Sequence, residues 1–134
     1  MPRVLVVEDS PLNQQVMTYF LESKGLECDL ATSGAQALTL VHTHTYDLIF
    51  LDLRIPNLDG FSAARAIRET GCTVPIIAVT ASAMPEDEKN AMESGMNAFM
   101  TKPFSRSDFD SAIAMWLKPK GGVEVAEPAV SSES

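Results

Sequence analysis

The sequence predicts a doubly wound α/β fold, with a five-stranded parallel sheet and helices on both faces. Five short apolar runs alternate with five segments whose apolar residues recur at helical spacing. One of the runs, residues 48–51, has four consecutive apolar residues, as expected for a strand buried on both faces. A strand with one face in water would alternate apolar and polar residues. Parallel strands need right-handed crossovers, which place helices on both faces.

The first half of the chain predicts two strands and two helices before the central strand. The expected order is a strand over 3–7, a helix over 11–24, a more polar edge strand over 27–31 and a helix opening at 32–34. Ser10 and Pro11 mark the start of the first helix. A serine side chain caps backbone N–H groups, and a proline is tolerated at the first helical position because the N–H it lacks would have no partner within the helix. The residues of the second helix expected to face the sheet are Ala35, Leu38 and Val41.

The second half predicts three strands and three helices. The expected order is the strand over 48–51, a helix over 61–70, a strand over 74–79, a short polar helix from Pro85 to Gly95, a strand over 97–101 and a helix capped by Ser105. The polar helix has few apolar residues to anchor it, so we expect it to be the loosest element. Residues 118–134 lose all periodicity and predict a disordered tail or linker stub after one domain over residues 1–117.

Composition limits the partners of the domain. The net charge is −8, from 10 basic and 18 acidic residues, so the sequence lacks the positive charge that nucleic acids and anionic membranes attract. Proteins or cations are the expected partners. No apolar run approaches ~18 residues and no signal peptide opens the sequence, which predicts a cytoplasmic protein. Cys28 and Cys72 have no CxxC spacing and are expected to be half-buried thiols.

Polar side chains directly follow four of the expected strands. Glu8 and Asp9 follow the first, Asp52 the third, Thr80 the fourth and Lys102 the fifth. An aspartate after a strand is often only a turn former or helix cap. However, the carboxyl ends of parallel strands all lie on one side, where ligands of such sheets bind. Polar side chains that follow four strands and meet at one edge of the sheet therefore predict a functional site.

The side chains at this edge suit a metal ion and a phosphoryl group. Carboxylates brought together resist ionisation unless a cation lies among them. Oxygen ligands without histidine or cysteine favour a hard ion such as Mg²⁺. Lys102 adds a fixed positive charge and Thr80 a hydroxyl donor, which match the needs of phosphoryl transfer. A carboxylate such as Asp52 can itself be the nucleophile and form an acyl phosphate.

Four segments together carry a resemblance to a known family. They are residues 6–14, residues 52–60, Thr80-Ala81 and Lys102-Pro103. With these segments in this order, the chain resembles the receiver domain of two-component response regulators over residues 3–117, especially receivers attached to hybrid sensor kinases. The resemblance implies a flavodoxin-like fold with strand order 2-1-3-4-5.

The resemblance also implies a role for each acidic residue. Asp52 would be the phosphoacceptor, and a histidine kinase or histidine phosphotransfer protein would donate the phosphoryl group. Glu8, Asp9, Asp52 and the backbone carbonyl of Arg54 would hold Mg²⁺, with Mn²⁺ as an alternative. The protein would be a switch that phosphorylates and dephosphorylates itself, rather than a turnover enzyme.

The remaining implied roles concern the switch. Thr80 and Lys102 would bind the phosphoryl oxygens, and Phe99 would pack inward as Thr80 is drawn to them. The bond between Lys102 and Pro103 would be cis. A downstream protein would bind the face formed by the fourth helix, fifth strand and fifth helix. Four methionines lie in this region, expected mostly in the core although exposed methionine suits a binding face: Met84, Met92, Met96 and Met100.

Two other functions compete with the receiver. A metal-dependent phosphatase of the haloacid-dehalogenase type needs a second aspartate two residues after the nucleophile, and Arg54 stands there instead. An adaptor that works without phosphorylation would usually lack one acid or Lys102, and all are present. Phe99 lacks the hydroxyl of the tyrosine commoner in the family. Arg54 is hypothesised to slow hydrolysis of the acyl phosphate, by ion-pairing with it or by crowding water.

Overall fold

The computed structural model describes residues 2–55, 59–81, 84–102 and 105–117. Pro103 and the expected tail lie outside the described residues. The elements, in chain order, are β1 (Arg3–Val7), α1 (Pro11–Ser23), β2 (Glu27–Ala31), α2 (Gly34–Thr43), β3 (Leu48–Asp52), α3 (Gly60–Glu69), β4 (Ile76–Thr80), α4 (Pro85–Glu93), β5 (Ala98–Thr101) and α5 (Arg106–Trp116).

The five strands form one sheet in the order β2-β1-β3-β4-β5, and every neighbouring pair is parallel. This confirms the expected strand order and places the polar strand β2 at an edge. The apolar strand β3 lies at the centre. Its five residues are all buried, as the continuous apolar run predicted.

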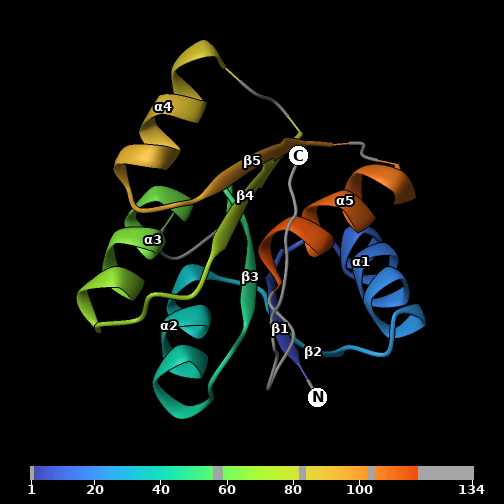
Figure 1. Cartoon of the computed structure of the whole chain (residues 1–134). Coiled ribbons are helices and arrows are strands. Elements are labelled where there is room, and N and C mark those ends of the chain that lie inside the picture. Colours follow the sequence, from blue (N-terminus) through green and yellow to red (C-terminus); the bar gives the residue numbers. More distant parts are fainter. Residues whose placement is uncertain (1, 56–58, 82–83, 103–104, 118–134) are drawn as a thin grey trace.

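Side chains from successive strand residues enter two separate cores. Leu5, Ile49 and Leu51 pack with residues of α2, α3 and α4 on one face of the sheet. Val6 and Phe50 pack with residues of α1 and α5 on the other face. Figure 1 shows this three-layer arrangement, with α2, α3 and α4 on one side of the sheet and α1 and α5 on the other. Successive strand side chains point to opposite faces of the sheet, and helices cover both faces. Both faces of each inner strand are therefore apolar.

Most helices begin at a side-chain cap. Ser10, Ser33, Asp59 and Ser105 each accept a hydrogen bond from the backbone N–H three residues on. Helix α4 is different, because Met84 occupies the N-cap position and has no side-chain oxygen to offer. Only Asp87 and Ala91 of α4 are buried, in agreement with the polar sequence of this helix.

The structure corrects three expectations about where elements begin or face. Strand β4 begins at Ile76 and not at Val74, because the proline before Ile76 has no N–H for a strand ladder. Strand β5 begins at Ala98 rather than one residue earlier. In α2, Ala35 is exposed and Ala37 is buried, because the inward face includes Gly34 and Ala37, three residues apart.

The methionines divide between surface and core. Met84 and Met92 are exposed on and beside α4, whereas Met96 is buried and Met100 packs against the core on the α1 and α5 side. Only two of the four methionines contribute to the core, so the expectation that most of them would do so is wrong. Cys28 and Cys72 are free and half-buried, as predicted. Among the described residues, no helix has both the length and the apolar character needed to cross a membrane.

Candidate functional site

The expected convergence of polar side chains at one edge of the sheet is present. Glu8 directly follows β1, Asp52 ends β3 and Lys102 directly follows β5. The Nζ atom of Lys102 lies 2.6 Å from Oε1 of Glu8 and 3.0 Å from Oδ2 of Asp52. One ammonium group therefore joins carboxylates that arrive on two other strands.

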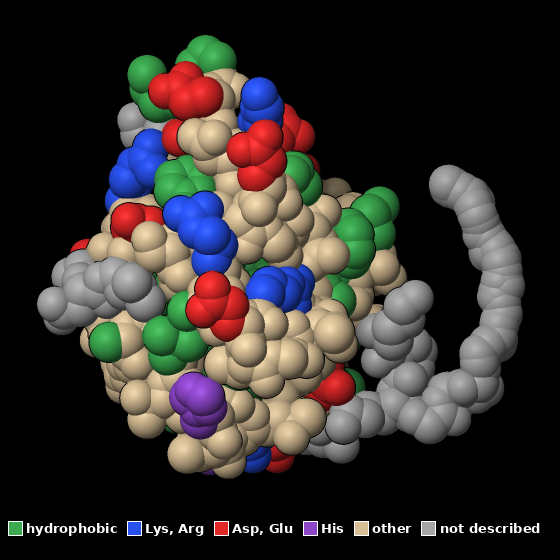
Figure 2. Space-filling model, turned by 90° about the vertical axis from the view of Figure 1, so that its left-hand side faces the viewer, with side chains coloured by type: hydrophobic (Ala, Val, Ile, Leu, Met, Phe, Trp, Pro, Cys, Tyr) green, Lys and Arg blue, Asp and Glu red, His purple; other side chains and the backbone are tan. Residues whose placement is uncertain are grey.

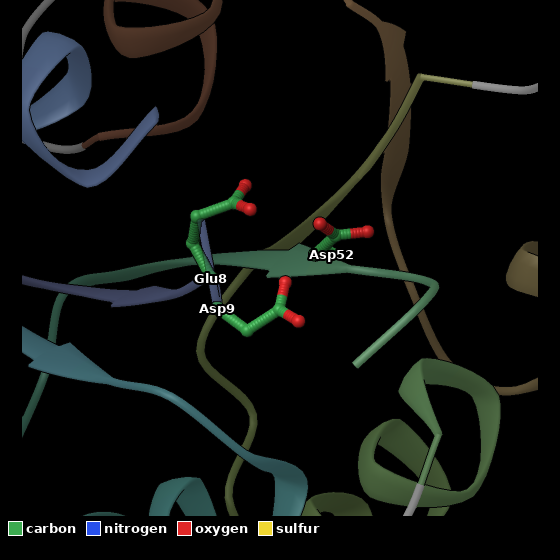
Figure 3. A group of neighbouring side chains, drawn as sticks. All are labelled: Glu8, Asp9 and Asp52. Carbon is green, nitrogen blue, oxygen red and sulfur yellow. The ribbon is translucent and has the colours of Figure 1, made fainter. Parts of the chain in front are cut away.

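Three carboxylates share this space. Glu8, Asp9 and Asp52 each offer an oxygen atom, and these atoms all lie within 4.8 Å of one another. Figure 3 shows the three side chains pointing into one space beyond the ends of β1 and β3. Glu8 and Asp52 are buried while Asp9 is exposed, so the group opens to solvent on the Asp9 side. An all-oxygen donor set of this kind fits a hard divalent cation such as Mg²⁺.

Backbone contacts fix the position of Asp52. The N–H of Arg54 donates to Oδ1 of Asp52 at 2.9 Å, and the N–H of Leu53 donates to the carbonyl of Val79 on β4 at 3.0 Å. Helix α3 begins directly against this segment. A Cβ at Gly60 would lie 2.6 Å from the carbonyl oxygen of Asp52, so only glycine allows this close approach. The glycine at position 60 is thus part of how Asp52 is held.

Glu8 is held from the helix that follows it. The N–H of Ser10 donates to Oε2 of Glu8 at 3.2 Å, and Nε2 of Gln14 donates to the carbonyl oxygen of Glu8 at 2.6 Å. Gln14 lies in one of the segments that carry the family resemblance, but the sequence assigned it no role. Its contact orients the loop that presents both Glu8 and Asp9.

Burial and charge shape the protonation of this group. Burial is the main cause that raises the pKa of Glu8 above its ordinary value, and the nearby charge of Asp52 acts in the same direction. Burial alone would lower the pKa of Lys102, but its hydrogen bonds and ion pairs with Glu8 and Asp52 outweigh burial and raise it. Lys102 is therefore a permanent cation at neutral pH. One ammonium against three carboxyl groups leaves room for further positive charge.

The other residues of the expected site lie at the ends of β4 and β5. Thr80 is fully buried, and its carbonyl oxygen accepts a hydrogen bond from the N–H of Lys102 at 2.8 Å. This bond ties the two strand ends together. Phe99 pairs with Ala78 across the sheet and is partly buried against the core on the α2, α3 and α4 side.

Arg54 makes a contact that the sequence did not predict. Its Nη2 atom lies 2.9 Å from Oδ2 of Asp87, in the first turn of α4. The Asp87 side chain is nearly buried and the Arg54 side chain is half exposed. No periodic or motif signal pairs two residues so far apart in the chain. The backbone N–H of Arg54 thus bonds the candidate phosphoacceptor, whereas its guanidinium is held by helix α4.

Comparisons with known proteins agree with this geometry. Residues 4–114 match the family model described as response regulator receiver domain. The sensor histidine kinase RcsC of Escherichia coli is 37% identical over 115 residues, which are 86% of this chain and 12% of that protein. The chain therefore spans about an eighth of the length of this relative.

Solved structures give the same result. The receiver domain of a sensor histidine kinase from Pseudomonas aeruginosa PAO1 has 42% identity and a TM-score of 0.79, covering 86% of this chain and 96% of that one. That crystal structure has a magnesium ion coordinated in its active-site cleft. The receiver domain of the Saccharomyces cerevisiae response regulator Ssk1, co-crystallised with the histidine phosphotransfer protein Ypd1, has 32% identity and a TM-score of 0.81, covering 86% of this chain and 88% of that one.

Proposed function

The chain belongs to the response regulator receiver family, and from this premise we propose that Asp52 accepts a phosphoryl group from a phosphohistidine. The observation that carries the proposal is the position of the Lys102 ammonium, within hydrogen-bonding distance of both Glu8 and Asp52. The proposed receiver extends over residues 1–117 of a cytoplasmic signalling protein.

In the proposed reaction, a carboxylate oxygen of Asp52 attacks phosphorus. The P–O bond forms as the P–N bond to the donor imidazole breaks, and the imidazole nitrogen keeps the electron pair and takes up a proton. Glu8, Asp9 and Asp52, with the carbonyl of Arg54, would hold Mg²⁺ or Mn²⁺, which supplies positive charge to offset the phosphoryl oxygens. Lys102 and the hydroxyl of Thr80 then bind those oxygens.

The proposed donor is a histidine kinase or a histidine phosphotransfer protein. The co-crystal of a related receiver with such a phosphotransfer protein, at 32% identity, supports this class of partner. For the output, we propose that a downstream protein binds the face of α4, β5 and α5, with Phe99 and Thr80 as the switch residues. The exposed methionines Met84 and Met92 suit an adaptable binding surface there.

Intact mass spectrometry tests the proposal. The protein is incubated with Mg²⁺ and acetyl phosphate, with and without a chelator. We expect the mass gain of one phosphoryl group with Mg²⁺, no gain with the chelator and no gain in Asp52→Asn. Glu69→Gln, which changes an exposed carboxylate at the end of α3, is the matched control and should gain the same mass as wild type.

The same incubation separates the competing functions. Steady release of phosphate from unrelated phosphate esters would favour the hydrolase. Failure of the protein to gain mass from either acetyl phosphate or a phosphorylated histidine protein would favour the adaptor.

A further inference from the structure

Helix α4 is attached to the rest of the domain differently at its two ends. At its C-terminal end, Arg65 donates from Nη1 to Oγ of Ser94 at 2.9 Å, and Arg68 donates from Nε to the carbonyl of Gly95 at 2.9 Å. Arg68 also donates to Oδ1 of Asn97 at 2.8 Å. Two arginines of α3 therefore hold this end through neutral acceptors.

The packing at this end is tight. Ser94 is buried, and a Cβ at Gly95 would lie 2.8 Å from Cγ of Arg68. Arg68 further donates to the carbonyls of Cys72 and Val74, so its guanidinium is fixed from several directions. None of these acceptors changes charge when Asp52 is modified.

At the N-terminal end, one carboxylate oxygen makes two bonds. Oδ2 of Asp87 accepts from Nη2 of Arg54 at 2.9 Å and from the N–H of Met84 at 2.9 Å. Met84 has no side-chain oxygen to cap the helix, so Asp87 both starts the helix and ties it to the β3–α3 loop. The Arg54 side chain is half exposed, so solvent rather than packed protein surrounds much of it.

Arg54 is also bonded to the candidate phosphoacceptor. Its backbone N–H donates to Oδ1 of Asp52 at 2.9 Å, so the backbone of Arg54 is fixed beside the carboxylate that would carry the phosphoryl group. A phosphoryl group there adds about two negative charges. An arginine binds phosphate oxygens through two parallel N–H bonds, and a phosphoryl group carries more negative charge than a carboxylate does.

We propose that Arg54 exchanges its ion-pair partner when Asp52 is phosphorylated. Its guanidinium leaves the Asp87 carboxylate and binds the phosphoryl group, which releases the first turn of α4. This inference rests on the proposed phosphorylation of Asp52. Loss of Arg54 leaves the Asp87 carboxylate buried without a cation, which favours movement of that turn into water. Arg65 and Arg68 keep the other end in place, so α4 pivots about its C-terminal end.

The surface of α4 is largely polar, and Ala91 is its one buried apolar residue. Figure 2 shows acidic and basic side chains interspersed over the face of the molecule that includes α4, with apolar side chains between them. Within the described part of the chain, α4 takes part in two ion pairs, Arg54 with Asp87 and the exposed pair of Lys89 with Glu93. The first of these is the one that reaches the site.

Amide hydrogen exchange, measured before and after phosphorylation on one sample, tests the pivot. Intact mass reports the phosphoryl group in the same sample. We expect exchange at residues 86–89 to become about fivefold faster or more on phosphorylation, and exchange at 92–95 to change less than about twofold. A gain in mass with unchanged hydrogen exchange at 86–89 would overturn the proposed change of partner by Arg54 but not the proposed function. Absence of a gain in mass would overturn both.

Variants separate the ion pair from the helix cap. Asp87→Asn keeps an oxygen for the Met84 N–H but removes the charge that holds Arg54. Its first turn should exchange rapidly before phosphorylation and respond little afterwards. Arg54→Gln should behave in the same way, and Arg54→Lys should recover part of the response. Glu86→Gln, which changes an exposed acid one residue away, should match wild type. An Asp87→Asn protein that responds as wild type does would contradict the proposal.

Discussion

The ammonium of Lys102 lies 3.0 Å from Oδ2 of Asp52, although the two residues are 50 positions apart and leave different strands of the sheet. The same atom lies 2.6 Å from Glu8. Strand β5 thus supplies the positive charge for acids that β1 and β3 bring to the site, and removal of that charge has a predictable cost.

Lys102→Ala should lower the free energy of unfolding by about 2–4 kcal/mol in the presence of a chelator, because two buried carboxyl groups lose their cation. Urea unfolding at neutral pH measures this. Lys89→Ala, which removes an exposed lysine paired with Glu93, should change the value by less than about 0.5 kcal/mol. Equal effects of the two substitutions would show that Lys102 does not neutralise the acids.

Mg²⁺ should stabilise the folded protein, because the three oxygens within 4.8 Å exist as a group only in the folded chain. Each tenfold rise in Mg²⁺ above its Kd should add about 1.4 kcal/mol. Thermal unfolding across a Mg²⁺ series measures the rise. Asp9→Asn should weaken the rise, because it removes the charge of one of the three possible ligands. Asp9 is exposed, so this substitution should leave the core unchanged. A Mg²⁺ response that is the same in Asp9→Asn and wild type would exclude Asp9 as a ligand.

Gly60→Ala should destabilise the fold by about 1–3 kcal/mol, because the new Cβ would meet the backbone of Asp52 and Leu53. It should also slow phosphorylation, since the Asp52 carbonyl must move. Gly25→Ala is the comparison: Gly25 has a φ of +78° and open space around it, so alanine there costs only about 1–2 kcal/mol of backbone strain. Normal phosphorylation of a folded Gly60→Ala protein would contradict the expected movement of Asp52.

Cys28 should be nearly inert to alkylation at pH 8. Burial raises the pKa of its thiol to about 11 from 9.0, so the folded protein carries about 100-fold less thiolate than the unfolded chain. Iodoacetamide labelling of a Cys72→Ala protein, with and without urea, measures the ratio. Because the folded pKa is the higher one, this contribution to stability is intact below pH 9 and is lost as the pH rises through about 11. Equal labelling rates in both states at pH 8 would refute the shift.

Arg54→Ala should shorten the lifetime of the phosphorylated protein by about threefold or more, if the guanidinium binds the phosphoryl group or crowds water away from it. The decay of the phosphorylated mass after removal of the donor measures this. Lys89→Ala serves as the surface control. An unchanged or longer half-life in Arg54→Ala would count against any protective role for this arginine.

The sequence predicted the site better than it predicted the contacts around it, for a physical reason. The short apolar run at 48–51 favours a strand with two covered faces, and parallel topology then brings the residues at the end of each strand to one edge. The positions of Asp52 and Lys102 follow from these two constraints. Neither depends on details of side-chain packing.

The missed features all depend on such details. Ala35 and Ala37 are equally apolar, and only the docking angle of α2 decides which is buried. Asn97 precedes β5, where its N–H donates to the carbonyl of Ile76 at 2.7 Å and its Oδ1 accepts from the N–H of Ile76 at 2.9 Å. The partner that Asp87 selects likewise depends on the positions of two elements in space, which hydrophobic periodicity does not encode.

A single oxygen of Asp87 accepts hydrogen bonds from both the Arg54 guanidinium and the N–H of Met84, the residue that precedes α4. If Arg54 leaves Asp87 on phosphorylation, thermodynamic linkage makes the effect reciprocal. A protein that binds preferentially to the released first turn would raise the equilibrium constant for phosphorylation of Asp52, by the same factor by which phosphorylation raises the affinity of that protein for the domain. The downstream target would then act as a cofactor of the modification as well as its recipient.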